Sequence, residues 1–150
     1  MKLLFAQHGA AHSEDEDPDR PLTTDGMAET RNVARTVSAA GLTVDRIWHS
    51  GKLRARQTAD LFAESLGGRV EERDDLGPTD DPAAAVEAAQ ATGHSVLLVG
   101  HKPFMERLPA LLLTGDADAT PVGVTYAGLG VLQGSGDRWS LVAYLPPSLV

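Results

Sequence analysis

Short apolar runs alternate with stretches of helical periodicity along the first three quarters of the chain. Continuous apolar runs are typical of strands covered on both faces, whereas apolar residues spaced three or four positions apart are typical of helices with one buried side. The predicted strands are Lys2–Gln7, Val44–Ser50, Ser95–Gly100 and a short edge strand at Arg69–Glu72. The predicted helices are Met27–Ala40, Lys52–Leu66, Pro82–Thr92 and Phe104–Leu113.

Capping and breaking residues mark the ends of these helices. Thr23 and its neighbours supply N-cap side chains for the first helix, and Gly41 ends it. Pro109 should kink or break the fourth helix, because proline lacks the N–H that an interior helical position donates. In the second helix, the residues expected to face the core are Leu53, Leu61, Phe62 and Leu66.

The pattern changes after Pro121, where strands follow one another without helices between them. The predicted strands are Val122–Tyr126, Leu129–Gln133 and Trp139–Leu145, and Gly134–Asp137 forms a hairpin turn between the last two. Alternating strands and helices followed by a β-rich end predict an α/β sandwich of three layers, with a mostly parallel central sheet and helices on both faces. A length of 150 residues suits a single domain, residues 1–150.

Composition narrows the possible functions. The chain has 13 Lys and Arg residues against 21 Asp and Glu residues, a formal net charge of −8, which disfavours nucleic-acid binding. It has no cysteine, which excludes disulfides, thiolate metal sites and a thiolate nucleophile. The apolar segment Met1–Ala6 is too short for a signal sequence or a membrane span, so we expect a cytoplasmic protein without membrane contacts.

The segment Glu14–Asp19 holds five of the 21 acidic residues. Such a charge run predicts a solvated loop. Clustered carboxylates also suit hard cations, but the segment lacks the spacing and the glycine of a calcium loop. We therefore expect no metal and no other cofactor, and the acidity is a local feature of the chain.

Three predicted strands run into loops or helix starts that carry a cationic or nucleophilic side chain: His8, Arg54 and His101. In open α/β sheets, ligands bind beyond the carboxyl ends of the strands, so parallel neighbouring strands would bring these side chains to one rim. Two imidazoles, a guanidinium and a helix N-terminus suit an anion, and phosphate foremost. Taken singly, each residue could instead be an ordinary loop or surface side chain.

The chain contains four sequence motifs: His8-Gly9, Arg20-Pro21-Leu22-Thr23, Ser50-x-x-x-Arg54-Ala55-x-Gln57-Thr58 and Gly100-His101. Together they resemble the histidine phosphatase superfamily, which has the phosphoglycerate mutase-like fold, and within it the short phosphohistidine phosphatases of the SixA type. The resemblance covers essentially the whole chain and implies an α/β sandwich and phosphoryl transfer through a covalent phosphohistidine, without a metal.

The resemblance also implies residue roles. His8 would be the nucleophile, Arg54 would clamp the phosphoryl oxygens, and His101 would donate a hydrogen bond to them. Arg20 would add positive charge at the mouth of the pocket. Gly9 is expected where backbone approaches a ligand closely, and Gln7 would also contact the substrate. The substrate would be a phosphorylated protein or a small phosphorylated compound.

Gln7 departs from the family pattern, which has arginine before the His-Gly pair. A glutamine amide donates a hydrogen bond but has neither the charge nor the fork of a guanidinium. The departure leaves open a second hypothesis, a non-catalytic module that binds phosphate or phosphoprotein. Arg56 and Lys102 are candidates for a compensating cation, although the surface is the simpler location for both.

Overall fold

The computed structural model describes residues 1–150 and shows one mixed sheet of six strands in the order β3-β2-β4-β1-β5-β6. The strands are β1 (Lys2–Gln7), β2 (Arg46–His49), β3 (Arg69–Glu72), β4 (Val96–Gly100), β5 (Leu129–Ser135) and β6 (Arg138–Leu145). The first four are parallel, whereas β5 and β6 form an antiparallel hairpin that pairs with the free side of β1. The prediction of a mostly parallel sheet is confirmed.

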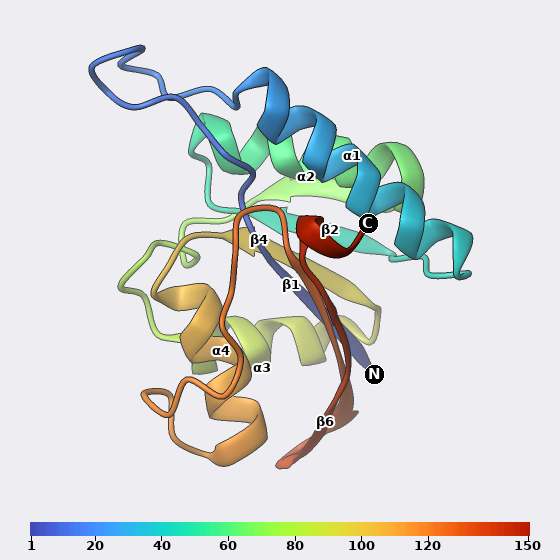
Figure 1. The fold of residues 1–150 in the computed structure, drawn as a ribbon. Coiled ribbons are helices and arrows are strands. Elements are labelled where there is room, and N and C mark those ends of the chain that lie inside the picture. The colour runs from blue at the N-terminus through green and yellow to red at the C-terminus, as the bar shows by residue number, and fades with distance from the viewer.

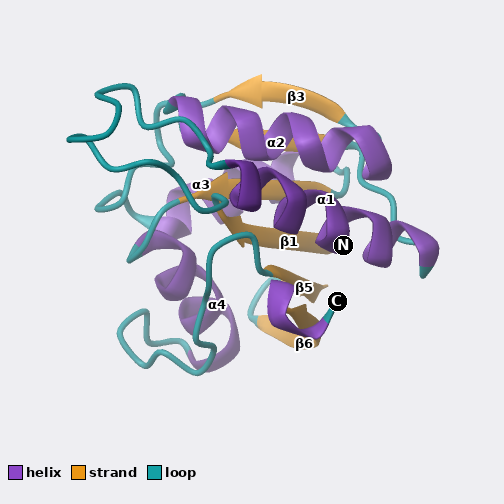
Figure 2. Cartoon of the chain, turned by 45° about the horizontal axis from the view of Figure 1, so that its top comes forward, coloured by secondary structure: helices purple, strands orange, loops and turns teal.

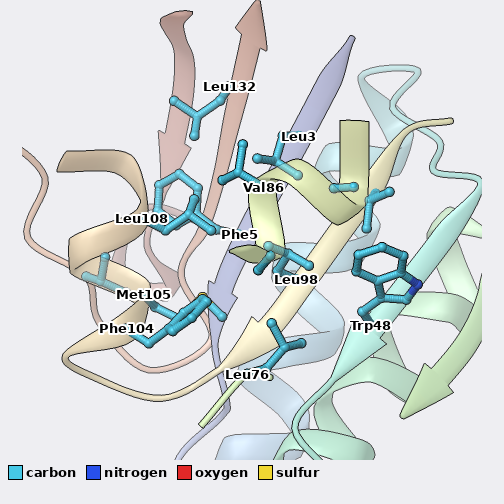
Figure 3. Close-up of a cluster of buried hydrophobic side chains, with 14 of the residues drawn as sticks. Leu3, Phe5, Trp48, Leu76, Val86, Leu98, Phe104, Met105, Leu108 and Leu132 are labelled. Carbon is cyan, nitrogen blue, oxygen red and sulfur yellow. The ribbon is translucent and has the colours of Figure 1, made fainter. Parts of the chain in front are cut away.

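Helices cover both faces of the sheet (Figure 1). They are α1 (Thr24–Ala39), α2 (Leu53–Leu66), α3 (Pro82–Thr92) and α4 (Phe104–Thr114), and a short 3-10 turn, η1 (Pro147–Leu149), follows β6. Alternate residues of each strand point to opposite faces, so Leu4 and Ala6 pack toward α1 and α2, whereas Leu3 and Phe5 pack toward α3 and α4. Figure 3 shows the second of these clusters, in which Phe5 and Leu98 meet helix residues such as Leu108.

Three expectations within these elements are wrong. Leu53 is 39% exposed rather than part of the core, because it is the first residue of α2 and the buried side of the helix begins with Ala55. Helix α4 is not broken at Pro109: it continues to Thr114, with Pro109 buried beside Leu108 although it cannot donate one helical hydrogen bond. The segment Val122–Tyr126 is a loop rather than a strand.

The physical reason for the third correction is that β1 is already paired on both sides. Val122 and Val124 alternate toward the core as a strand would, and both are buried. However, β4 and β5 occupy the two edges of β1, so only one bridge, from Gln7 to Tyr126, remains beyond the end of β5. The alternating pattern therefore predicted correctly which side chains of this segment are buried, but not that its backbone lacks the hydrogen bonds of a strand.

The long loops gather at one end of the molecule (Figure 2). The acidic segment Glu14–Asp19 lies in the loop between β1 and α1, and most of its side chains are exposed, as predicted for a solvated loop. No helix has both the length and the apolar character that crossing a membrane requires.

Candidate active site

His8 and His101 lie side by side because the strands that precede them are paired. Gln7, the last residue of β1, is in register with Gly100, the last residue of β4, and the amide of His8 donates to the carbonyl of Gly100 at 2.9 Å. The two imidazole rings that follow have centroids 5.1 Å apart, and the residues are only 5% and 4% exposed. The convergence predicted from the strand ends is thus a direct result of parallel pairing.

The surroundings of His8 fix its tautomer and its charge. Its Nδ1 lies 2.7 Å from the carbonyl oxygen of Gly9, and because a carbonyl only accepts, Nδ1 carries the proton. Burial lowers the pKa of His8 to about 4, against the opposing effect of the Gly9 hydrogen bond and with smaller contributions from Arg54 and Arg20. His8 is therefore neutral at pH 7, and its Nε2 has a free lone pair.

We expect His8 and His101 to stay neutral down to about pH 4 in an NMR titration of the ring nitrogens, since the pKa of each is lowered to about 4, chiefly by burial. In the chain unfolded by urea, both should titrate near the ordinary value of 6.5. Because the folded-state pKa is the lower one, both histidines reduce stability as the pH falls from 6.5 toward 4. Midpoints near 6.5 in the folded protein would contradict the burial argument.

Arg54 lies in the first turn of α2. Its positive charge is close enough to the two histidines to contribute to the lowered pKa of both His8 and His101. Its Nε is buried and has no hydrogen-bond partner in the protein. An unmet buried donor costs about 1–3 kcal/mol, which an anionic ligand at this point would recover. An anion bound beside Arg54 would thus stabilise its guanidinium group.

The remaining residues of the Ser50-to-Thr58 motif hold the surrounding loops together. Nε2 of His101 lies 2.6 Å from Oγ of Ser50, the residue just beyond β2. Gln57 accepts a hydrogen bond from the amide of Leu22 at 2.8 Å, and Thr58 accepts one from the amide of Gly9 at 2.9 Å. One turn of α2 therefore anchors the loops that carry His8 and Arg20.

The geometry gives Gly9 a structural role, and its contact with a ligand stays a prediction. Its amide is already engaged by Thr58, and its carbonyl orients the imidazole of His8. A Cβ at this position would lie 2.7 Å from the hydroxyl of Thr30 and 3.1 Å from the carbonyl of Gly26. Glycine is needed here because the chain passes close to α1.

Arg20 lies at the mouth of a groove of about 400 Å³ that also includes Arg54 and Lys52. Its Nε donates to the carbonyl of His12 at 3.0 Å, and its backbone has a left-handed φ of 50°. Glu14 and Asp19 line the same groove, so the acidic loop borders the site. The groove thus combines three cations with two carboxylates, which suits an anion but disfavours an excess of negative charge.

Neither of the two candidate compensating cations points into this groove. Lys102 is paired with Glu106 at 3.0 Å. Arg56 lies in a separate hollow with Asp60 and Glu72. Lys52, by contrast, forms no ion pair and lies two residues before Arg54 in the groove.

Sequence reasoning missed Tyr126 and the part played by Ser50. The ring of Tyr126 lies 5.5 Å from that of His8. No local signal marked it, since it closes a segment whose alternation predicted a strand. Ser50 was part of a recognised motif, but its contact with His101 depends on the pairing of β2 with β4.

The comparisons with known proteins agree with this geometry. The model of the histidine phosphatase superfamily (branch 1) matches residues 3–80. Phosphohistidine phosphatase SixA of Escherichia coli is 31% identical over 77% of this chain and 76% of its own length. An uncharacterised protein of Picosynechococcus sp. is 39% identical over 69% of this chain and 67% of its own length. The chain therefore belongs to the histidine phosphatase superfamily.

Comparison with solved structures extends over nearly the whole chain. The structure of the protein histidine phosphatase SixA complexed with tungstate superposes with a TM-score of 0.86 and 27% identity, over 99% of this chain and 98% of that one. The predicted phosphoglycerate mutase-like sandwich is confirmed. Family and fold together support a phosphatase, and they do not favour the non-catalytic binding module suggested by Gln7.

Proposed function

We propose that this phosphatase hydrolyses phosphohistidine, in a protein or a peptide, through a covalent intermediate on His8. The observation that carries the proposal is the state of the His8 ring. It is buried and neutral, its Nδ1 is tied to Gly9, and Nε2 is its free nucleophilic nitrogen. A relative named phosphohistidine phosphatase supports the substrate class.

The reaction proceeds in two displacements at phosphorus. Nε2 of His8 bonds to phosphorus while the P–N bond of the substrate breaks, and its electron pair leaves on the substrate imidazole, which takes up a proton. Arg54 binds the equatorial oxygens with the N–H that is otherwise unmet, and His101 contacts them from the other ring. Water then attacks the phosphoryl group on His8, releasing phosphate and the free imidazole.

No general acid is required for this leaving group. A protonated imidazole leaves far more readily than an alkoxide, so a phosphohistidine substrate needs no proton from a side chain of the enzyme. Asp80 and Asp81 are occupied elsewhere: Asp80 accepts from the amide of Gly77, and Asp81 caps α3. Alkyl phosphates should therefore be poor substrates.

The test is to trap the intermediate. The protein is mixed with a ³²P-labelled phosphohistidine peptide and quenched in alkali, which preserves phosphohistidine. We expect label on a peptide containing His8, and the His94→Ala variant, altered at an exposed histidine at the opposite end of β4, should be labelled equally. Hydrolysis without label on His8 would contradict the covalent route, and no hydrolysis would contradict the proposed activity.

A further inference from the structure

Tyr126 places an aromatic surface beside the reacting histidine. Its ring centroid lies 5.5 Å from that of His8 with an interplanar angle of 41°, yet the residue is 47% exposed. One part of the ring therefore contacts the buried site while the rest borders solvent. Neither the phosphoryl transfer described above nor the packing of the core requires an aromatic ring at this position.

The loop that carries Tyr126 is held in place by the sheet. The amide of Ala127 donates to the carbonyls of Gln7 at 3.1 Å and His8 at 3.3 Å, and the amide of Thr125 donates to the hydroxyl of Tyr144 on β6 at 2.9 Å. The flanking backbone on both sides of Tyr126 is thus fixed to β1 and β6. The backbone of this loop therefore loses little freedom when a ligand binds beside Tyr126.

A hollow of about 380 Å³ opens beside this ring, lined by Glu29, Thr125, Tyr126, Pro147 and Ser148. Its one charged side chain, Glu29, is a carboxylate, in contrast to the three cations of the groove around Arg54. The hollow therefore suits a neutral or cationic group rather than a phosphate.

In-line displacement places the leaving group on the side of phosphorus away from His8. Because His8 is buried and the neighbouring ring of Tyr126 is 47% exposed, a leaving group that extends from the site toward solvent would pass beside this ring. We propose that Tyr126 is a specificity-determining residue, on which the ring of the leaving group stacks, so that the site favours phosphoryl groups carried by an aromatic ring and above all by imidazole. The inference rests on the proposed function and extends it to the choice of leaving group.

The test compares two substrates with the same P–N bond, a phosphohistidine peptide and phosphoramidate, which has no ring. In Tyr126→Ala we expect kcat/KM for phosphohistidine to fall about 3- to 10-fold, the range of an aromatic pair, with phosphoramidate unaffected. Tyr126→Phe keeps the ring and should keep the preference. Thermal unfolding of both variants checks that the loop is intact.

Two results would overturn this inference alone. An equal loss for both substrates in Tyr126→Ala would give the residue a structural role, and no loss for either would show that the ring does not contact the leaving group. Failure of the unmodified protein to hydrolyse both substrates would overturn the proposed function and the inference with it.

Discussion

Replacing His8 with alanine is expected to lower kcat/KM by on the order of 10⁴-fold or more, the scale seen when a covalent nucleophile is removed. No other side chain can take its place. The imidazole of His101 lies beside that of His8, but its Nε2 is hydrogen-bonded to the hydroxyl of Ser50 at 2.6 Å. The chain has no cysteine to offer an alternative nucleophile.

The His8→Ala variant should still bind inorganic phosphate, because Arg54 and its unmet N–H remain. Steady-state hydrolysis of a phosphohistidine peptide and calorimetric titration with phosphate therefore separate chemistry from binding, and His94→Ala serves as the unaffected control. Turnover near the normal rate in His8→Ala would mean that water attacks the substrate directly. Loss of phosphate binding would instead mean that His8 mainly shapes the pocket.

The sequence was sufficient to predict the parts of this site that depend on strand ends. His8 and His101 each follow an apolar run, and β1 and β4 are paired in parallel, so the rule that ligands bind beyond strand ends brought the two together. The start of the first helix was also predictable from the sequence: Thr23 caps α1 by accepting a hydrogen bond from the amide of Gly26. The helix caps are decided by local chemistry, whereas the meeting of the two histidines followed from a general rule about where parallel strands end.

The parts that could not be predicted depend on contacts between distant segments. Tyr126 faces His8 only because β5 pairs with β1 and stops short of Gln7. The engagement of Gly9 by Thr58 spans 49 residues. Periodicity predicts which side of an element is buried, but it does not say which edge of a strand is already paired with another strand.

The same distinction applies to Arg56 and Lys102, the two candidates for a compensating cation, for which the surface was the simpler location. Arg56 and Lys102 are close to site residues in sequence, yet Arg56 lies in a separate hollow, and Lys102, which precedes α4, pairs with Glu106 on that helix. Arg20 and Arg54 are far apart in the chain, yet both line one groove. Sequence proximity was therefore a poor guide to where positive charge gathers.

Replacing Gln7 with arginine is expected to raise kcat/KM by about 10- to 100-fold. Gln7 is 7% exposed at the end of β1, and its side-chain amide makes no hydrogen bond within the protein. A guanidinium directly before His8 would add a charge-assisted hydrogen bond to the phosphoryl oxygens, worth about 1.5–3 kcal/mol in the transition state. Hydrolysis of a phosphohistidine peptide by the purified variant measures the gain.

Two matched variants show which property of the arginine matters. Gln7→Lys supplies charge without the fork and should give a smaller gain, whereas Gln7→Met removes the amide donors and should lower activity. Unchanged or lower activity in Gln7→Arg would mean that the site is already balanced by Arg20 and Lys52, which line the groove with Arg54. In that case glutamine is fitted to this protein's own substrate, and adding Lys52→Met to Gln7→Arg should restore the benefit of the new guanidinium.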